Sequence, residues 1–561
     1  MADEPRGKLA KDIEEARKAL EESAGDARLH ARLAGLLKNA GDVEGAKRHC
    51  QLAIAIDPTQ VGAAIDLGNM LIRECDYTGA LAAFGLAQVY RPDEGLRLRM
   101  ALMVPPITES RDQIALIAAR VKRALAALSK SNLTIADPSR DAAALFYLAY
   151  YGVMDRTFYE QLADIHLKAC PSLAQAAPHV ANPGTRRARV DKEAGEQIKV
   201  GFVSRFFFDH SIGRLNRGLI AKLDREVFHV TVAAIPYVSD AVTKEIAESA
   251  DRAIRVPLKL DEARKVLARQ ELDVIVYPEI GMDSFTYCLA FARLAPVQCV
   301  TWGHPVTTGI PNMDYFVSGD DMEIAEADEH YRETLARLKT FTSYYTKPER
   351  SETPKGRADF GLDADAHYYL VAQYLFKMHP DFDDVLARIL RGDAKGRILM
   401  VEGSVPRWSK LLMARFKKTI PDVADRIEFI KRQSQKDFFD LIACADVSLD
   451  IPHFNGGNTT IEALLVGTPV VTMAVQLARG RLCAAIHTHL GVTDGVADSV
   501  DAYVDVALRL GTKASFRKKV REKILANNHK LFDNEDAVRE WERFFLEACA
   551  AKGIQPAQAV A

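Results

Sequence analysis

The sequence lacks the features that would place this chain in a membrane, an oxidising compartment or a complex with nucleic acid. No apolar run is long enough to span a bilayer, and the first residues, Met1–Arg6, form no apolar signal region. The eight cysteines are scattered, with no C-x-x-C pair and no Cys/His cluster at zinc-binding spacing. A formal net charge of −2 gives no reason to expect nucleic acid or an anionic membrane as a partner. We therefore expect a cytoplasmic protein with reduced thiols.

The N-terminal part contains an internal repeat with the 34-residue period of tetratricopeptide repeats, in which small residues let two helices pack closely. Six positions recur after that displacement: Leu33, Ala34, Leu37, Ala46, Ala53 and Pro58 correspond to Leu67, Gly68, Leu71, Ala80, Ala87 and Pro92. About two and a half units, within residues 1–95, are few for a free-standing array. We therefore expect the end of the array to be capped by packing against the helical segment that follows. A protein-binding surface and a structural appendage are equally good interpretations of these repeats.

A chain of 561 residues is too long for one hydrophobic core, and the predicted elements divide the rest of it into three further regions. Residues 96–195 look helical without a repeat and end in a linker at Ala176–Arg189. In residues 196–355 and 356–550, β-branched runs alternate with helical patterns, which predicts two doubly wound parallel sheets. The predicted strands are Ile198–Ser204, Val230–Ile235, Val274–Tyr277, Val297–Thr301, Tyr368–Gln373, Arg397–Val401, Ile427–Ile430, Asp446–Leu449 and Pro469–Met473. Such sheets bind ligands at the carboxyl ends of their strands, so we expect a site built from both lobes.

The most informative stretch is a glycine turn, Asn455–Asn458, between a predicted strand and a predicted helix, Thr459–Val466. The free N–H groups at the start of a helix attract anions, and Gly456 and Gly457 let a phosphate approach with no Cβ in the way. One helical turn further on, Glu462 could accept the two hydroxyls of a ribose. These residues predict a nucleotide diphosphate site, although a plain turn capped by Asn and Thr explains them equally well.

Other chemically versatile residues also follow predicted strands. His210 and the turn Gly303–Gly309, with its imidazole and hydroxyl groups, follow strands of the first lobe, and Lys377 follows the first strand of the second. A histidine can take a proton at neutral pH, and a lysine could neutralise a diphosphate leaving group. Arg479 and Arg481 could add charge to the same anion or cap a helix. Packed histidines and solvated lysines or arginines are the ordinary alternatives.

Four motifs occur in a fixed order: Asp209–Arg214, Ala295–Pro311, Gln373–Lys377, and Asn455–Pro469 with Arg479–Arg481 after it. On these motifs the chain, from Ile198 to about Phe545, resembles the catalytic region of the O-GlcNAc transferase family, including its SPINDLY-type and bacterial tetratricopeptide-linked members. The resemblance implies an α/β fold of the GT-B glycosyltransferase type, with two doubly wound Rossmann-like lobes after an all-α tetratricopeptide region. It further implies inverting, metal-independent transfer of a sugar from UDP-GlcNAc or a similar UDP-sugar to Ser/Thr hydroxyls of a protein. No cofactor other than the nucleotide-sugar co-substrate is expected.

The resemblance also implies roles for individual residues, and no metal ligand is among them. The catalytic residues it implies are His210, His304 and Lys377, of which His210 either removes a proton or only positions the substrates. Thr307 and Thr308 are expected on the acceptor side. The expected donor-binding residues are Gln373, Arg432, Gln433, Asn455, Gly456, Gly457, Asn458, Thr459, Thr460, Glu462, Arg479 and Arg481.

The chain departs from the family pattern in ways that leave donor and acceptor open. No histidine stands in the loop Gly456–Thr460, Tyr374 takes the place of a glutamine, and the repeat array is short. One alternative is a dedicated flagellin or adhesin glycosyltransferase using another donor, such as a CMP-nonulosonic acid, and another is a non-catalytic tetratricopeptide scaffold. The expected partners are a nucleotide sugar and a protein acceptor, with flagellin as one candidate, recruited by the repeats. Those repeats could equally form a homodimer.

Overall fold

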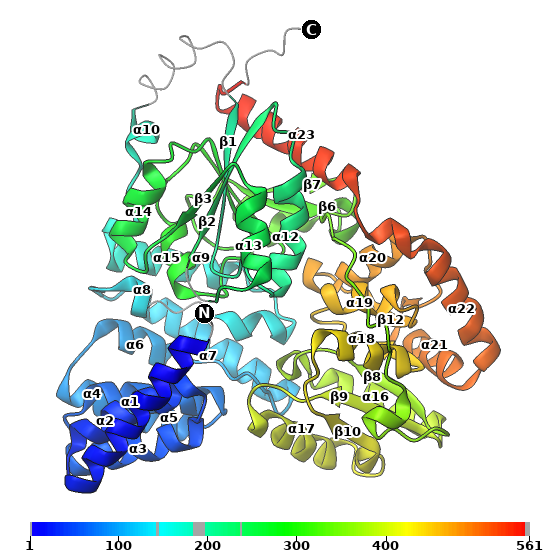
Figure 1. The fold of residues 1–561 in the computed structure, drawn as a ribbon, viewed down its shortest axis with the longest axis horizontal. Helices are drawn as coiled ribbons and strands as arrows, with labels where there is room; N and C mark the ends of the chain where they lie inside the picture. The colour runs from blue at the N-terminus through cyan, green and yellow to red at the C-terminus, as the bar shows by residue number, and fades with distance from the viewer. Residues whose placement is uncertain (1–2, 142–144, 183–196, 236–237, 556–561) are drawn as a thin grey trace. The chain divides into compact units, whose positions relative to one another are not determined.

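The computed structural model describes residues 3–141, 145–182, 197–235 and 238–555 (Figure 1). The chain divides into two compact units: a repeat unit, residues 1–107 and 132–137, and a two-lobed unit, residues 108–131 and 138–561. Among the helices of the described residues, none has both the length and the apolar character needed to cross a membrane.

The repeat unit is built of helices only. They are α1 (Asp3–Glu22), α2 (Ala27–Ala40), α3 (Val43–Ile56), α4 (Val61–Arg73), α5 (Tyr77–Tyr90) and α6 (Glu94–Ala101). The pair α4–α5 begins 34 residues after the pair α2–α3, and Asp42 and Asp76 cap the second helix of each pair. A Cβ on Gly68 would lie 2.4 Å from the ring of Phe84, so the small residue permits close helix packing. The assignment of residues 1–95 as tetratricopeptide repeats stays a prediction.

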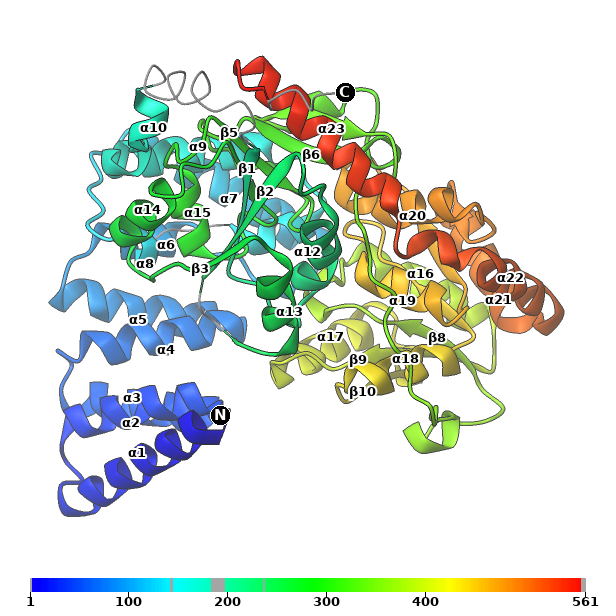
Figure 2. The ribbon, with the colours of Figure 1, turned by 45° about the horizontal axis from the view of Figure 1, so that its top comes forward.

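The first lobe of the two-lobed unit contains a seven-stranded parallel sheet in the order β3-β2-β1-β4-β5-β6-β7. Figure 2 labels β1, β2, β3, β5 and β6 of this sheet. Its strands are β1 (Ile198–Ser204), β2 (Phe228–Ala234), β3 (Arg252–Arg255), β4 (Val274–Tyr277), β5 (Val297–Thr301), β6 (Tyr315–Gly319) and β7 (Thr334–Leu338). The helices between them are α12 (Ser211–Lys222), α13 (Ala241–Ser249), α14 (Leu260–Ala268) and α15 (Ser284–Ala290). Before this sheet come α7 (Arg111–Ser129), α8 (Pro138–Asp141), η1 (Phe146–Tyr151), α9 (Arg156–Ala169) and α10 (Pro178–Ala181).

The second lobe repeats this architecture with six parallel strands in the order β10-β9-β8-β11-β12-β13. Its strands are β8 (His367–Val371), β9 (Gly396–Val401), β10 (Ile427–Ile430), β11 (Val447–Leu449), β12 (Val470–Met473) and β13 (Val496–Ala497). Its helices are η6 (Leu375–Lys377), α16 (Asp381–Gly392), α17 (Pro406–Thr419), α18 (Gln435–Cys444), α19 (Asn458–Leu465), α20 (Leu482–Leu490), α21 (Val500–Thr512) and α22 (Ala514–Asn527). The predicted fold class, two Rossmann-like lobes after an all-helical region, is confirmed.

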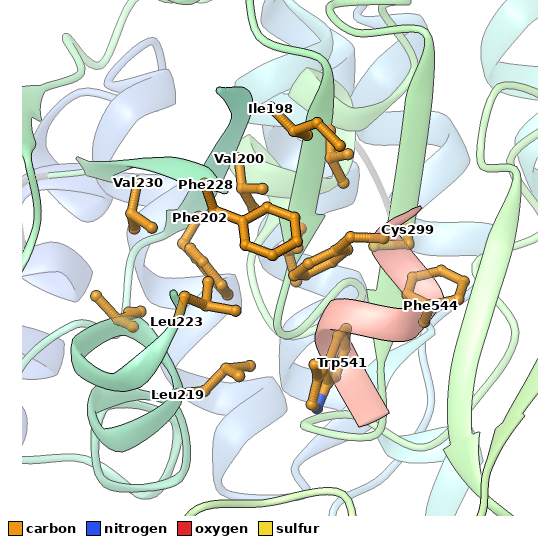
Figure 3. Packing of buried hydrophobic residues seen from close by; sticks show 14 of the residues in the cluster. Ile198, Val200, Phe202, Leu219, Leu223, Phe228, Val230, Cys299, Trp541 and Phe544 are labelled. Carbon is orange, nitrogen blue, oxygen red and sulfur yellow. The ribbon is translucent and has the colours of Figure 1, made fainter. Parts of the chain in front are cut away.

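The last helix, α23 (Glu535–Ala551), returns to the first lobe and completes its core (Figure 3). Trp541 and Phe544 pack with Val200 and Phe202 of β1, all of them buried. The indole N–H of Trp541 donates to the Thr342 carbonyl at 2.9 Å, which satisfies its one buried polar group. Burial of these large rings ties the end of the chain to the sheet that precedes the second lobe.

All nine predicted strands exist, within about two residues at each end. Four strands were not predicted: β3, β6, β7 and β13. β3 has the sequence RAIR with mostly exposed side chains, so it lacks the apolar run of a buried strand, and β13 has only two residues. The predicted linker Ala176–Arg189 begins with the short helix α10, and its part from residue 183 onward lies outside the described residues.

Candidate active site

A pocket of about 600 Å³ is lined by residues of both lobes. Segments that follow β1, β5, β8 and β11 line it, so it lies at the carboxyl ends of strands in both sheets. In each sheet the strand order reverses direction between two adjacent strands, β1 and β4 in the first sheet and β8 and β11 in the second. Such switch points are where open parallel sheets bind ligands, and the volume suits a nucleotide sugar.

The glycine turn is held in shape by Asp450, at the end of β11. Its Oδ1 accepts from the Gly456 N–H at 2.8 Å and from the Gln373 side chain at 2.5 Å, and its Oδ2 accepts from the Thr472 hydroxyl at 2.8 Å. The carboxyl is buried, which raises its pKa. No role was predicted for Asp450 from the sequence, although an acidic residue directly after a buried strand was an available signal.

Within the turn, Gly456 is the residue for which a side chain has no room. A Cβ at this position would lie 2.1 Å from the Thr459 Oγ1 and 2.9 Å from the Gln373 Nε2. Asn458, the first residue of α19, is buried, lines the pocket and has an Nδ2 with no hydrogen-bond partner in the described part of the chain. The helix start and this amide together offer unused N–H donors to an anion.

Lys377 lies beside the turn. Its Nζ donates to the Asn455 carbonyl at 2.8 Å and lies 4.6 Å from the centre of the Phe454 ring. Burial lowers the pKa of Lys377 to about 8, although the nearby Asp450 carboxylate acts in the opposite direction. The protein therefore holds a poorly solvated ammonium against the glycine turn, and a bound phosphate would favour its charged form.

Glu462 forms an ion pair that sequence reasoning did not anticipate. Its Oε1 lies 3.2 Å from the Arg214 Nη1, which joins α19 of the second lobe to α12 of the first. Arg214 also pairs with Asp209 at 2.9 Å. Burial raises the pKa of Glu462 to about 7, outweighing the effect of Arg214. Arg214 stands in the first motif, so a charged residue at the start of the helix that follows β1 was the signal.

His210 and His304 of the first lobe line the pocket in neutral form. His210 caps α12, with its Nδ1 accepting from the Ile212 N–H at 3.2 Å, and burial, aided by Arg214, lowers its pKa to about 4. His304 stacks on Phe146 with 5.3 Å between ring centres, and burial lowers its pKa to about 3. Its Nε2 has no hydrogen-bond partner among the described residues. A pKa so far below neutral makes either side chain a weak general base.

Most of the predicted site residues come together in this pocket. The pocket-lining ones are His210, His304, Gln373, Lys377, Arg432, Gln433, Asn455, Gly456, Gly457, Asn458, Thr459, Glu462 and Arg479. Of these, Arg479 forms a buried ion pair with Asp155 at 2.9 Å, so its charge is already balanced. Its predicted part in donor binding, like the other predicted roles, stays a prediction.

Four predicted residues do not line the pocket: Thr307, Thr308, Thr460 and Arg481. The Thr307 hydroxyl donates to Glu333 at 2.6 Å, and the Thr308 N–H donates to the same carboxylate at 2.8 Å. The Thr460 hydroxyl donates to the Gly456 carbonyl at 2.6 Å, and Arg481 donates to the Val475 carbonyl at 3.1 Å. These contacts support the loops around the site, a role that spacing in the sequence does not distinguish from ligand contact.

Two Rossmann-like lobes sharing one pocket at their strand ends define the fold class of the protein, the GT-B type. The fold is that of a lysine-to-methionine mutant of the O-GlcNAc transferase of Thermobaculum terrenum, with a TM-score of 0.70 and 21% sequence identity over 97% of this chain and 96% of that one. The family model Glycosyl transferase family 41 matches residues 346–540. These matches support the resemblance carried by the four motifs: the chain is similar to the O-GlcNAc transferases of the family 41 type.

Curated relatives agree with this assignment. The probable UDP-N-acetylglucosamine–peptide N-acetylglucosaminyltransferase SPINDLY of Hordeum vulgare is 26% identical over 345 residues, which cover 59% of this chain and 36% of that protein. The UDP-glucose:protein N-beta-glucosyltransferase of Actinobacillus pleuropneumoniae is 24% identical over 348 residues, covering 61% of this chain and 54% of that protein. The chain thus spans little more than a third of the length of the plant relative.

Proposed function

We propose that this protein transfers a sugar from a UDP-sugar, UDP-GlcNAc or a close analogue, to Ser or Thr hydroxyls of a protein acceptor, with inversion. The observation that carries the proposal is the anion-binding geometry of the second lobe. Lys377, the glycine turn and the start of α19 line one pocket with the buried Glu462. An ammonium and unused N–H groups suit a diphosphate, and a carboxylate one turn deeper suits the hydroxyls of a ribose.

The reaction is a single displacement at the anomeric carbon. The acceptor oxygen forms a bond to that carbon while the bond to the donor phosphate oxygen breaks, and the nucleoside diphosphate leaves. Lys377 and the helix dipole at Asn458 stabilise the charge that develops on the leaving group. The acceptor proton goes to a donor phosphate oxygen, because the low pKa of His210 leaves it a weak base and better suited to positioning the substrates.

Protein acceptors are favoured by the relatives, whose names give a peptide or a protein as the substrate. In this proposal the helical repeat unit recruits the acceptor, for which flagellin is one candidate, and the reaction takes place in the cytoplasm. A homodimer formed through the same helices is the alternative use of that unit.

Calorimetric titration of the metal-free protein with UDP, GDP and CMP in parallel tests the donor assignment. We expect saturable binding of UDP that is lost in Lys377→Ala and kept in Lys355→Ala, a control whose half-exposed lysine pairs with Asp437 outside the pocket. Binding of CMP in preference to UDP would favour transfer of a nonulosonic acid. Absence of binding for all three nucleotides would contradict an enzyme of this class and favour a scaffold.

A further inference from the structure

Three side chains outside the pocket converge on a second site of a different kind. His379 follows η6, Asp381 is the first residue of α16, and His453 lies in the loop after β11. One nitrogen of each ring and one oxygen of the carboxylate all lie within 4.8 Å of one another. His379 Nδ1 is 3.4 Å from Asp381 Oδ1, and His453 Nε2 is 3.1 Å from Asp381 Oδ2. The two imidazole rings are 3.9 Å apart at their centres.

We propose that His379, Asp381 and His453 bind a divalent transition-metal ion of the zinc type. Two imidazole nitrogens and one carboxylate oxygen are the ligand types that zinc takes, whereas magnesium and calcium prefer oxygen ligands throughout. Three protein ligands leave a fourth position for solvent in a tetrahedral arrangement. His379 is almost fully buried, while Asp381 and His453 keep about a quarter of their side-chain surface exposed, which gives an ion a route from solvent.

Arg111 of α7 contacts the same carboxylate and supplies a positive charge to it. Its side chain is 73% exposed, so it can swing into solvent at little cost. Asp381 is therefore already paired with a cation, and an incoming metal ion must displace that guanidinium. The metal ion and the Arg111 guanidinium therefore compete for the Asp381 carboxylate, and removing the Arg111 charge should strengthen metal binding.

The position of the cluster gives the ion a structural role. None of its three residues lines the pocket. His379 stands two residues after Lys377, and His453 stands two residues before Asn455, whose carbonyl accepts from the Lys377 ammonium. A metal ion would fasten the segment that carries Lys377 to the segment that begins the glycine turn.

The test is titration of tag-free, chelator-treated full-length protein with zinc chloride by calorimetry, and with cobalt chloride followed by visible absorption. We expect one ion per chain at micromolar or tighter affinity, and the intense visible bands of four-coordinate cobalt. His453→Ala should weaken zinc binding at least about 10-fold. His367→Ala is the matched control, because His367 pairs with Asp393 at 2.7 Å without a second imidazole, and it should leave binding unchanged.

Arg111→Gln should tighten zinc binding several-fold, since it leaves the three ligands in place and removes the competing charge. Asp381→Asn gives a second loss-of-binding variant in case His453→Ala does not fold, as judged by circular dichroism. The absence of saturable zinc binding in the natural protein, or binding that persists in both ligand variants, would overturn the proposal. Binding lost equally in His367→Ala would show a site elsewhere and overturn it as well.

Discussion

The two lobes have the same strand order around their switch points but supply side chains of different charge to the pocket. Counting from the edge, β3-β2-β1-β4-β5-β6 in the first lobe matches β10-β9-β8-β11-β12-β13 in the second. The loop after β1 brings His210, whereas the loop after β8 brings Lys377. The fold therefore fixes where side chains meet the ligand, and the loop sequences decide what those side chains do.

Burial lowers the pKa of the basic side chain in both loops, but only one of the two side chains keeps its charge at neutral pH. The pKa of His210 falls to about 4, so the ring is neutral and carries no charge to a donor phosphate. The pKa of Lys377 falls by a similar amount but starts from a higher ordinary value, so at about 8 it still leaves the ammonium charged at neutral pH. We therefore expect the anion to bind on the second lobe and the uncharged acceptor hydroxyl to lie on the first.

Among variants that test the difference between the two lobes, Lys377→Ala should have the largest effect. We expect transfer to fall at least about 100-fold, equivalent to about 3 kcal/mol of transition-state stabilisation, because the leaving group loses its ammonium. Thermal unfolding should change little, since a buried charge with one hydrogen bond is removed. Initial rates and melting temperatures of the two proteins check this, and a variant that retains its natural transfer rate would disprove the assignment of the leaving-group site.

Gly456→Ala tests the turn without altering any charge. The added methyl would lie 2.1 Å from the Thr459 hydroxyl, so the turn must shift away from the anion-binding geometry. We expect UDP affinity to fall about 10-fold, the equivalent of about 1.4 kcal/mol. Gly35→Ala is the matched control, because a Cβ there meets nothing within 4 Å. Equal UDP affinity in both variants would show that the glycine turn does not bind the diphosphate.

The sequence could predict the lobes and most of the pocket because both depend on local patterns. Buried parallel strands are short apolar runs, and the glycine turn has a sequence signal of its own. Pairing between distant segments leaves no local signal in the sequence. The Arg214–Glu462 pair joins residues 248 positions apart, and the Arg479–Asp155 pair joins residues 324 positions apart. The same limit explains why the contacts of Thr307 and Thr308 were not predicted, because their partner Glu333 lies in another loop.

His210→Asn tests the first lobe on its own. Asparagine is a good N-cap, so α12 should form as before. We expect transfer to fall about 10-fold, less than the 100-fold or more that loss of a general base costs, and UDP affinity to stay unchanged. Measuring turnover and UDP binding in the same preparation separates the two effects. A fall in UDP affinity as large as that of Lys377→Ala would remove the contrast between the lobes.

The smallest effect concerns Glu462, which forms an ion pair with Arg214 of the other lobe. Its pKa of about 7 means that the free protein gains the carboxylate as pH rises from 6 to 8. If that carboxylate accepts ribose hydroxyls, UDP affinity should rise several-fold over this interval in the natural protein relative to Glu462→Gln. The ratio of the two UDP affinities, natural protein over Glu462→Gln, cancels the effect of the ionisation of UDP itself. A ratio independent of pH would exclude the ionised carboxylate as a ribose ligand.

The same residue predicts a stability difference with a defined sign. Because folding raises the pKa of Glu462 above its ordinary value of 4.5, the folded protein binds the proton more tightly, and its stability falls as pH rises from 4.5 to 7. Glu462→Gln removes that penalty, while Asp209 still pairs with Arg214. The variant should therefore unfold at a higher temperature than the natural protein above pH 7, and this advantage should shrink toward pH 5. Melting curves across that range check the sign, and an advantage that grows on acidification would mean that Arg214, not burial, dominates the environment of the carboxyl.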